Sequence, residues 1–312
     1  MTRRDAPAWR AEPPPEPFTI EGADGGPLRG DLYPAPAGGA GGPAPGPGGS
    51  APGPAGPLAL PPLAVLCHGF RSYKDWGFQP FLAARLAEEG IPAVTFSFSG
   101  SGVADATGAF AEPERFRRNT YTAELEDLRR VLRWAEGRLG PRAAGLIGHS
   151  RGGGIALIHA VEDPRIRAVA LLATPRAICV WPAEYYGLWE RGEDALFLDF
   201  RTRTPLRLGA QYLADIKALG ERCDLTRAVA SLRVPILIVQ GDRDRQVTME
   251  EAKALALAGA ANLTELRVIQ HAAHAFQAGD TLRRTPPPLL DMCDAVTAWM
   301  RRWLAFRPAP VT

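Results

Sequence analysis

The sequence predicts an α/β fold: a mostly parallel central sheet with helices on both faces and a helical lid insertion. Three observations support this. Short apolar segments alternate with amphipathic helical segments from residue 63 to the C-terminus. Residues 146–154 read as the end of a buried strand, a tight turn and the glycine-lined start of a helix. Residues 175–231 interrupt the alternation with an aromatic-rich segment that has no clear buried strand.

Length and composition favour an ordinary globular protein. The chain has 312 residues, of which 46% are hydrophobic and 22% charged, and this is enough for one large α/β domain or two smaller ones. A net charge of +2 argues against a general affinity for nucleic acid. No apolar run approaches the length of a membrane span, and the first 18 residues lack the apolar core of a signal peptide. We therefore expect a cytoplasmic protein without membrane or nucleic-acid partners.

The four cysteines are scattered and form no C-x-x-C pair. The sequence therefore indicates neither a zinc site nor a disulfide framework. Two of them, Cys67 and Cys179, have apolar neighbours and are expected to be small core residues. The other two are Cys223 and Cys293.

The chain divides into a main domain and several segments without a core of their own. Residues 1–17 are proline-rich and are expected to be disordered, and the main domain spans residues 18–306. Within it, 19 of the 29 residues in 34–62 are glycine or proline, which predicts a disordered insertion between two strands. Residues 175–231 are the candidate lid or cap, and residues 307–312 form a tail.

Local patterns place the regular elements. Residues 63–67 are all apolar, as in a strand that is covered on both faces. Residues 120–139 carry apolar side chains at helical core spacing, with Asn119 or Thr120 as the cap. Strands are expected over residues 18–21, 28–33, 63–67, 93–98, 144–147, 166–173, 234–239 and 263–269. Helices are expected over residues 78–89, 120–139, 152–160, 249–258 and 288–306.

The segment Gly148-His149-Ser150-Arg151-Gly152 has the spacing G-x-S-x-G. In this pattern a strained strand-to-helix turn pushes a serine hydroxyl out over the end of a sheet. Glycine is needed on both sides because residues two before and two after the serine approach closely. The five-residue pattern alone is weak, and it gains meaning only if an acid and a histidine follow at later strand ends.

Both partners follow in the required order. Asp242 and Asp244 come after the strand predicted at residues 234–239, and His271 and His274 come after the next strand. The carboxyl ends of parallel strands form the edge where sites are assembled, so these residues are expected to meet the serine. The pattern leaves either aspartate as the acid and either histidine as the base. A metal site built on the two histidines lacks a third cluster of ligands.

These motifs together resemble the α/β-hydrolase fold family over about residues 63–306. Residues 68–70 read His-Gly-Phe after an early strand, and G-x-S-x-G follows. A later turn of the form G-x-x-D-x-x-V is matched by Gly241, Asp244 and Val247, and a histidine loop comes after it.

The resemblance implies roles for five residues. Ser150 is the nucleophile, Asp244 the acid and His274 the base, and motif position favours these two over the neighbouring aspartate and histidine. The backbone N–H groups of Phe70 and Arg151 are expected to form the oxyanion hole.

The same resemblance narrows the chemistry. The long aromatic loop at residues 70–77 is similar to that of serine esterases and acyl-peptidase-like members, a group that includes feruloyl esterase-like enzymes. Residues 97–102 lack the charged, histidine-containing loop of many relatives, and dienelactone hydrolases use cysteine where this chain has serine. The implied function is a serine hydrolase that cleaves a small carboxylic ester through an acyl-enzyme, without a cofactor or metal.

Several alternatives remain open. The same triad serves peptidases, thioesterases and acyltransferases, and a non-catalytic relative would keep the fold as a binding protein. Aromatic side chains are expected either to bind an apolar or aromatic acyl group or to pack the lid. They are Trp76, Phe78, Trp181, Tyr185 and Trp189. His68 and His149 are expected to be structural, and an acidic substrate group is an alternative partner for the Arg151 side chain. The oligomeric state is not predicted.

Overall fold

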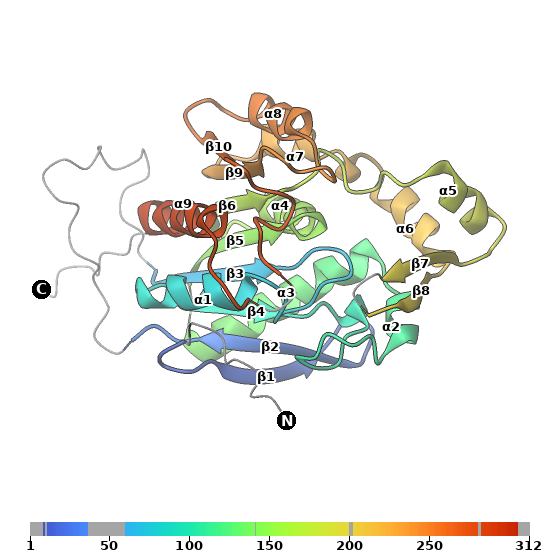
Figure 1. Ribbon diagram of the computed structural model, residues 1–312, viewed down its shortest axis with the longest axis horizontal. Coiled ribbons are helices and arrows are strands. Elements are labelled where there is room, and N and C mark those ends of the chain that lie inside the picture. The colour runs from blue at the N-terminus through green and yellow to red at the C-terminus, as the bar shows by residue number, and fades with distance from the viewer. Residues whose placement is uncertain are drawn as a thin grey trace, which may run out of the picture.

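The protein is described by a computed structural model that covers residues 9, 11–36, 60–140, 142–199, 202–279 and 282–304. These residues form an eight-stranded sheet with helices on both sides, and a separate two-stranded hairpin projects to one side (Figure 1). The α/β fold class predicted from the sequence is confirmed.

The central sheet is parallel apart from its first two strands. Its order is β1-β2-β4-β3-β5-β6-β9-β10, with β1 antiparallel to β2 and β2 antiparallel to β4. All other neighbouring pairs are parallel. Strand β2 alone runs against the others, so the carboxyl ends of seven strands meet at one edge. The strands are β1 (Glu16–Glu21), β2 (Pro27–Tyr33), β3 (Pro62–Cys67), β4 (Ala93–Phe96), β5 (Ala143–His149), β6 (Ile166–Leu172), β9 (Ile236–Gly241) and β10 (Thr264–Ile269).

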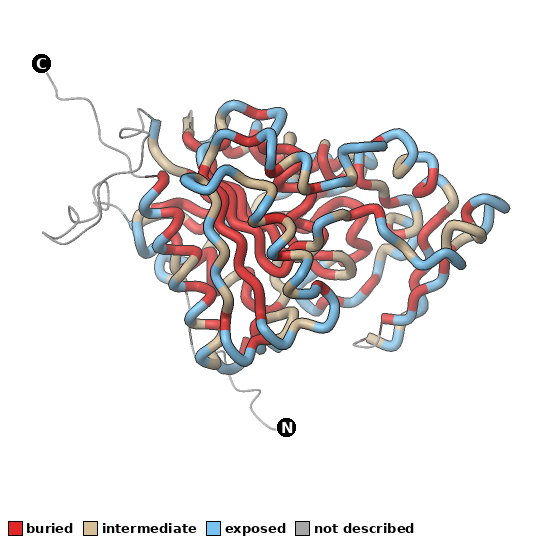
Figure 2. The backbone as a smooth tube through the Cα atoms, turned by 90° about the horizontal axis from the view of Figure 1, so that it is seen from above, coloured by how far each residue is buried: buried red, intermediate tan, exposed pale blue. Residues whose placement is uncertain are grey.

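Helices cover the two faces of the sheet and enclose two apolar cores. One core includes Leu82 and Leu289, from α1 and α9, and the other includes Leu128, Leu157 and Leu255, from α3, α4 and α8. Figure 2 shows the buried residues concentrated along the central strands between these layers. The helices are α1 (Gln79–Glu88), α2 (Pro113–Arg117), α3 (Tyr121–Leu139), α4 (Arg151–Glu162), α5 (Ala183–Glu190), α6 (Gln211–Leu219), α7 (Leu225–Ser231), α8 (Met249–Ala258), α9 (Pro287–Trp303) and the short 3₁₀ helices η1 (Ser99–Ser101) and η2 (Gly220–Cys223). Within the described ranges, no helix has both the length and the apolar character needed to cross a membrane.

The N-terminal boundary differs from the expected one. Strand β1 begins at Glu16, so two residues assigned to the disordered segment 1–17 belong to the sheet. The strand is anchored by Phe18, whose ring stacks on Trp134 of α3 at 3.6 Å between centroids. Most of the insertion predicted at residues 34–62 and all of the tail at 307–312 lie outside the described residues.

Residues 175–231, which we call the insertion, lie between β6 and β9, two strands that pair directly. The insertion contains α5, α6, η2 and α7, together with a hairpin of β7 (Ala195–Asp199) and β8 (Thr204–Leu208). The sequence shows no clear buried strand here, and the structure adds a half-exposed hairpin that the pattern did not predict. Buried and exposed residues alternate along β7, with Leu196 and Leu198 exposed. The strand was missed because its exposed positions also carry apolar side chains, which hides the period of two.

A disulfide closes the neck of the insertion and corrects the expectation of no disulfide. Cys179 and Cys223 are bonded, with 5.5 Å between their Cα atoms and a sequence separation of 44. The two segments are also joined by a hydrogen bond of 3.2 Å from the N–H of Ile178 to the carbonyl of Cys223. Spacing alone gave no sign of the bond, because folding of the whole insertion brings the two segments together. Cys67 and Cys293 are free and buried, and Cys67 is a core residue, as predicted.

We expect protein denatured without reductant to expose two reactive thiols, Cys67 and Cys293, and four after reduction. Breaking the bond by the double change Cys179→Ala and Cys223→Ala should lower the free energy of unfolding by on the order of 4 kcal/mol, the loop-closure entropy of a crosslink of this length. Thiol titration counts the free thiols, and urea unfolding measures the change in the free energy of unfolding. Four thiols before reduction, or unfolding at the same urea concentration as wild type, would contradict the bond.

Candidate active site

The turn between β5 and α4 carries Ser150 in a backbone conformation that L-residues rarely adopt. Its φ is 53° and its ψ is −124°. Two hydrogen bonds hold the turn: the N–H of Ser150 donates to the carbonyl of Leu172 at 2.8 Å, and its carbonyl accepts from the N–H of Gly153 at 2.9 Å. The serine is therefore held at the carboxyl end of the central strands by the backbone itself.

The glycines around Ser150 allow close backbone approach. A Cβ at Gly148 would lie 2.4 Å from the carbonyl oxygen of Gly152, and one at Gly152 would lie 2.3 Å from that of His68. A Cβ at Gly153 would lie 1.9 Å from Oγ1 of Thr174. These distances are too short for any side chain, so the glycine requirement inferred from the sequence has a steric cause.

Asp244 and His274 meet at the same edge of the sheet. Asp244 follows β9 and His274 follows β10, and Nδ1 of His274 donates to Oδ2 of Asp244 at 2.8 Å. The other carboxylate oxygen, Oδ1, accepts from the N–H groups of Gln246 and Val247 at 2.8 and 3.1 Å. In a neutral imidazole with its proton on Nδ1, Nε2 is free to accept a proton.

The environment of Asp244 favours its ionised form. Burial, the largest effect, raises the pKa of the carboxyl group, but the hydrogen bond and charge of His274 and two backbone N–H donors outweigh it, so the pKa is lowered. Since the pKa is depressed, the ionised carboxylate contributes stability above the ordinary aspartate value of about 4, and that contribution is lost as pH falls through the lowered value.

The rival acid and base lie elsewhere. Asp242 is exposed and accepts from the N–H of Ala272 at 3.2 Å. His271 is also exposed, and its Nδ1 accepts from Nη2 of Arg243 at 2.8 Å. The structure brings together Asp244 and His274 and places the other two in the surrounding loops.

His149 connects the histidine loop to the turn at Ser150. Its Nε2 donates to the carbonyl oxygen of His274 at 3.0 Å, and the two imidazole rings lie 4.8 Å apart. Burial above all, together with the nearby charge of His274, lowers the pKa of His149 to about 3, so it is neutral at physiological pH. His149 therefore fixes the position of His274 relative to Ser150, the residue that follows His149 in the chain.

His68 supports the loop that begins at Gly69. Its Nε2 accepts from the N–H of Phe98 at 3.0 Å and its Nδ1 donates to the carbonyl of Gly69 at 2.8 Å, which fixes the tautomer. Burial, the largest cause, lowers the pKa of His68 to about 3. The loop is also tied down by Lys74, whose ammonium pairs with Asp31 of β2.

Two backbone N–H groups next to Ser150 remain available. A Cβ built at Gly69 lies 3.2 Å from the Cβ of Ser150, so the loop with Phe70 packs against the serine. Among the described residues, none accepts a hydrogen bond from the backbone N–H of Phe70 or Arg151. Arg151 is the first residue of α4, where the helix dipole also favours negative charge.

The five aromatic residues expected near the substrate fall into two groups. Phe78 is 1% exposed and packs against His149, and Trp189 is 3% exposed and donates from Nε1 to the carbonyl of Leu208 at 3.0 Å. Both are core residues with almost no surface for a ligand. The remaining three are half-buried: Trp76, Trp181 and Tyr185.

Sequence reasoning missed two polar residues beside the site. Gln240 is fully buried at the end of β9, and its Nε2 donates to Oδ2 of Asp244 at 3.1 Å. Glu124 of α3 is buried and pairs with the guanidinium of Arg151, which is 9% exposed. Arg151 is therefore committed to an internal partner, and the alternative of an acidic substrate group at its side chain was wrong. Two features of the sequence could have identified them. Gln240 is a polar residue in an apolar strand, and Glu124 is an acidic residue on the core face of a helix.

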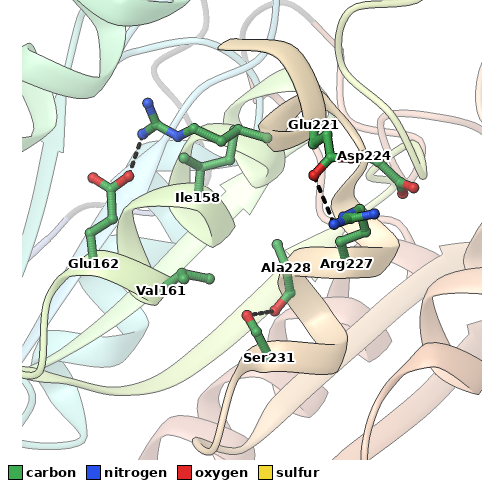
Figure 3. A pocket seen from close by; sticks show the side chains of 9 residues that line it. Ile158, Val161, Glu162, Glu221, Asp224, Arg227, Ala228 and Ser231 are labelled. Carbon is green, nitrogen blue, oxygen red and sulfur yellow. Dashed lines mark hydrogen bonds and ion pairs between the residues drawn. The ribbon is translucent and has the colours of Figure 1, made fainter.

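A surface groove of about 290 Å³ lies apart from these residues (Figure 3). It runs between the end of α4 and η2–α7, and more than about 10 Å of helix separates it from the start of α4. Four of its five charged side chains form ion pairs, Glu162 with Arg222 and Glu221 with Arg227. None of the predicted site residues lines it.

Comparison with known proteins is consistent with this architecture. Residues 64–310 match the model of the alpha/beta hydrolase family. The esterase domain of a Rhodothermus marinus protein is 23% identical, with a TM-score of 0.59 over 93% of this chain and 99% of that one. Est1E from Butyrivibrio proteoclasticus, solved with ferulic acid bound, is 20% identical, with a TM-score of 0.63 over 92% and 99%. At these identities the two structures show the fold alone. No curated protein matches the chain.

Proposed function

Because the chain belongs to the alpha/beta hydrolase family, we propose that it is a serine hydrolase that cleaves a small carboxylic ester. Ser150 is the nucleophile, His274 the general base and Asp244 the acid. The observation that carries this proposal is the bond of 2.8 Å between Asp244 and His274, at the sheet edge where the strained turn holds Ser150.

The proposed reaction proceeds through an acyl-enzyme. Nε2 of His274 takes the hydroxyl proton of Ser150 as Oγ attacks the ester carbonyl, and the ionised Asp244 stabilises the imidazolium that forms. His274 then returns the proton to the departing alcohol. Water, deprotonated by the same imidazole, then attacks the acyl-enzyme; the bond to Oγ breaks, the imidazolium returns its proton to Ser150, and the acid is released. None of these steps calls for a cofactor.

Two N–H groups are proposed as the oxyanion hole. The free backbone donors of Phe70 and Arg151 would hold the negative oxygen of the tetrahedral intermediate, which needs donors that are already in place. Removing one such donor costs about 3 kcal/mol in comparable sites. The bonds that His68 makes to Gly69 and Phe98 are therefore expected to support catalysis by holding this loop.

The proposed substrate carries an apolar or aromatic acyl group. The ring centroids of Phe70 and Trp181 lie 5.3 Å apart, and those of Trp181 and Tyr185 lie 6.2 Å apart. Half-buried rings therefore extend from the proposed oxyanion hole into the insertion. Trp76 stacks on His149, with 5.7 Å between the ring centroids. The ferulic acid in Est1E is an aromatic acid bound to a protein of the same fold.

A panel of p-nitrophenyl esters with graded aliphatic and aromatic acyl groups tests the substrate proposal. We expect kcat/KM to rise with apolar acyl size and to fall on Trp181→Ala for aromatic esters more than for acetate. Equal rates for all acyl groups would contradict it. Adding competing amines and alcohols and identifying the products then separates ester hydrolysis from acyl transfer.

The base assignment predicts that kcat/KM falls toward acid. Asp244 stays ionised because its pKa is lowered, and His68 and His149 stay neutral because burial lowers the pKa of each to about 3. An imidazole accepts a proton only in its neutral form, so activity should be lost toward acid. Rates on a reactive ester, with circular dichroism to confirm folding, measure this. A flat profile would contradict the assignment.

The sequence favours a location in the cytoplasm. The disulfide between Cys179 and Cys223 argues against that location. Disulfides persist mainly in oxidising compartments. Thiol counting on protein that is alkylated during cell lysis decides between the two. Four free thiols would support the cytoplasm, and two would overturn it.

A further inference from the structure

The side chain of Arg151 occupies a buried polar cluster directly behind the proposed oxyanion hole. Nη2 bonds to Oε1 of Glu124 in α3, and Nη1 donates to the hydroxyl of Tyr212 in α6 at 2.9 Å. The guanidinium also lies 4.5 Å from the centre of the Phe70 ring. The Arg151 side chain therefore contacts Phe70, whose N–H is the other proposed oxyanion donor, and α6, a helix of the insertion.

The partners of Arg151 are themselves fixed. Glu124 accepts a second hydrogen bond of 2.7 Å from Asn119, and burial, opposed by the charge of Arg151, raises its pKa. Helix α6 is docked on the start of α3, where Oδ2 of Asp215 accepts from the backbone N–H of Tyr121 at 2.7 Å. A buried pair with this many partners permits few alternative arrangements.

The chemistry of the cluster requires arginine. Its planar group donates to the carboxylate of Glu124 and to the Tyr212 hydroxyl while its face covers the ring of Phe70. A lysine would keep the charge but lose the fork of donors and the stacking surface. The contacts therefore depend on the directions of the guanidinium N–H groups as well as on the positive charge.

We propose that the Arg151 side chain is a positioning residue that fixes the N–H groups of Phe70 and Arg151 relative to each other and couples them to the docking of α6 through Tyr212. The coupling of loop and insertion stands on the contacts alone, and its effect on catalysis rests on the proposed serine hydrolase function. A shift of α6 then changes the oxyanion hole without touching Ser150, Asp244 or His274.

Three variants and a matched control test the proposal. Arg151→Met removes every polar contact of the side chain, Arg151→Lys keeps the charge, and Tyr212→Phe removes one hydroxyl and is the mildest change. Arg133→Met is the control, because Arg133 makes an exposed ion pair on the same helix as Glu124. Each is assayed with a p-nitrophenyl ester and with its thionoester, whose sulfur is a poor hydrogen-bond acceptor and gains little from an oxyanion hole.

For the ester we expect kcat to fall by about 10- to 100-fold in Arg151→Met and about 3- to 10-fold in Tyr212→Phe, with KM within about twofold, because displaced donors act on the transition state. Arg151→Lys should lie between wild type and Arg151→Met. The thionoester rate should fall far less, and Arg133→Met should match wild type. Equal losses on both substrates, or an unchanged ester kcat in Tyr212→Phe, would overturn the proposal.

Hydrogen–deuterium exchange tests the coupling without any assay of activity. Exchange should rise together in the loop at residues 70–77 and in α6 when Tyr212 or Arg151 is changed, and Arg133→Met should leave both unchanged. A rise in α6 alone would overturn the coupling. Should wild type lack ester activity while both segments respond together, the proposed function fails and the coupling stands.

Discussion

Replacing Ser150 with alanine is expected to reduce ester hydrolysis by at least about 10⁴-fold. The change removes the oxygen that attacks the carbonyl, and the remaining oxyanion donors cannot replace a covalent step. Steady-state kinetics on p-nitrophenyl butyrate measures the loss. Replacing His274 with alanine should have an effect of similar size, because the two side chains act as a unit.

The matched control for the base is His271→Ala, three residues away in the same loop. His271 is exposed and bonded to Arg243, so its loss should leave kcat within about twofold of wild type. Thermal unfolding of all three variants separates a chemical effect from a folding defect. If folded Ser150→Ala keeps more than about one hundredth of wild-type activity, another nucleophile carries the reaction.

Replacing Asp244 with asparagine is expected to lower kcat by about 10⁴-fold. The asparagine oxygen can still accept from the N–H groups of Gln246 and Val247, which turns its amide toward Nδ1 of His274. Nδ1 must then accept, the imidazole proton moves to Nε2, and His274 can no longer take the proton of Ser150. Kinetics at saturating ester measures the loss.

Asp242→Asn is the control for this change. Asp242 is exposed, and the oxygen of an asparagine can keep the bond that its side chain accepts from the N–H of Ala272, so we expect kcat within about twofold of wild type. Equal losses in the two variants, or a larger loss at Asp242, would contradict the assignment of the acid.

The sheet and the placement of the candidate triad could be predicted because their signals are local. Apolar segments mark the strands, and in a parallel sheet the residues that follow each strand meet at one edge, so Ser150, Asp244 and His274 were expected to converge. The glycines at 148 and 152 indicated that backbone segments approach closely around Ser150, and the structure shows this close approach.

What the sequence could not predict depends on the packing of distant segments. The disulfide from Cys179 to Cys223 forms because the insertion folds back on its own start, and no spacing rule encodes that path. Arg151 pairs with Glu124, 27 positions earlier, only once α3 lies beside α4. Aromatic residues gave no sign of whether they face a ligand or the core, and Phe78 proved to be buried.

The central claim is that Ser150 is a nucleophile activated by His274 and Asp244. It is tested most directly by treating the folded protein with a fluorophosphonate and mapping the modified peptide by mass spectrometry, with Ser150→Ala and Asp244→Asn treated in parallel. We predict one phosphonyl group on Ser150 in the wild type, none in Ser150→Ala and much slower labelling in Asp244→Asn. Absence of label in folded wild type, or label on another residue, would contradict the account.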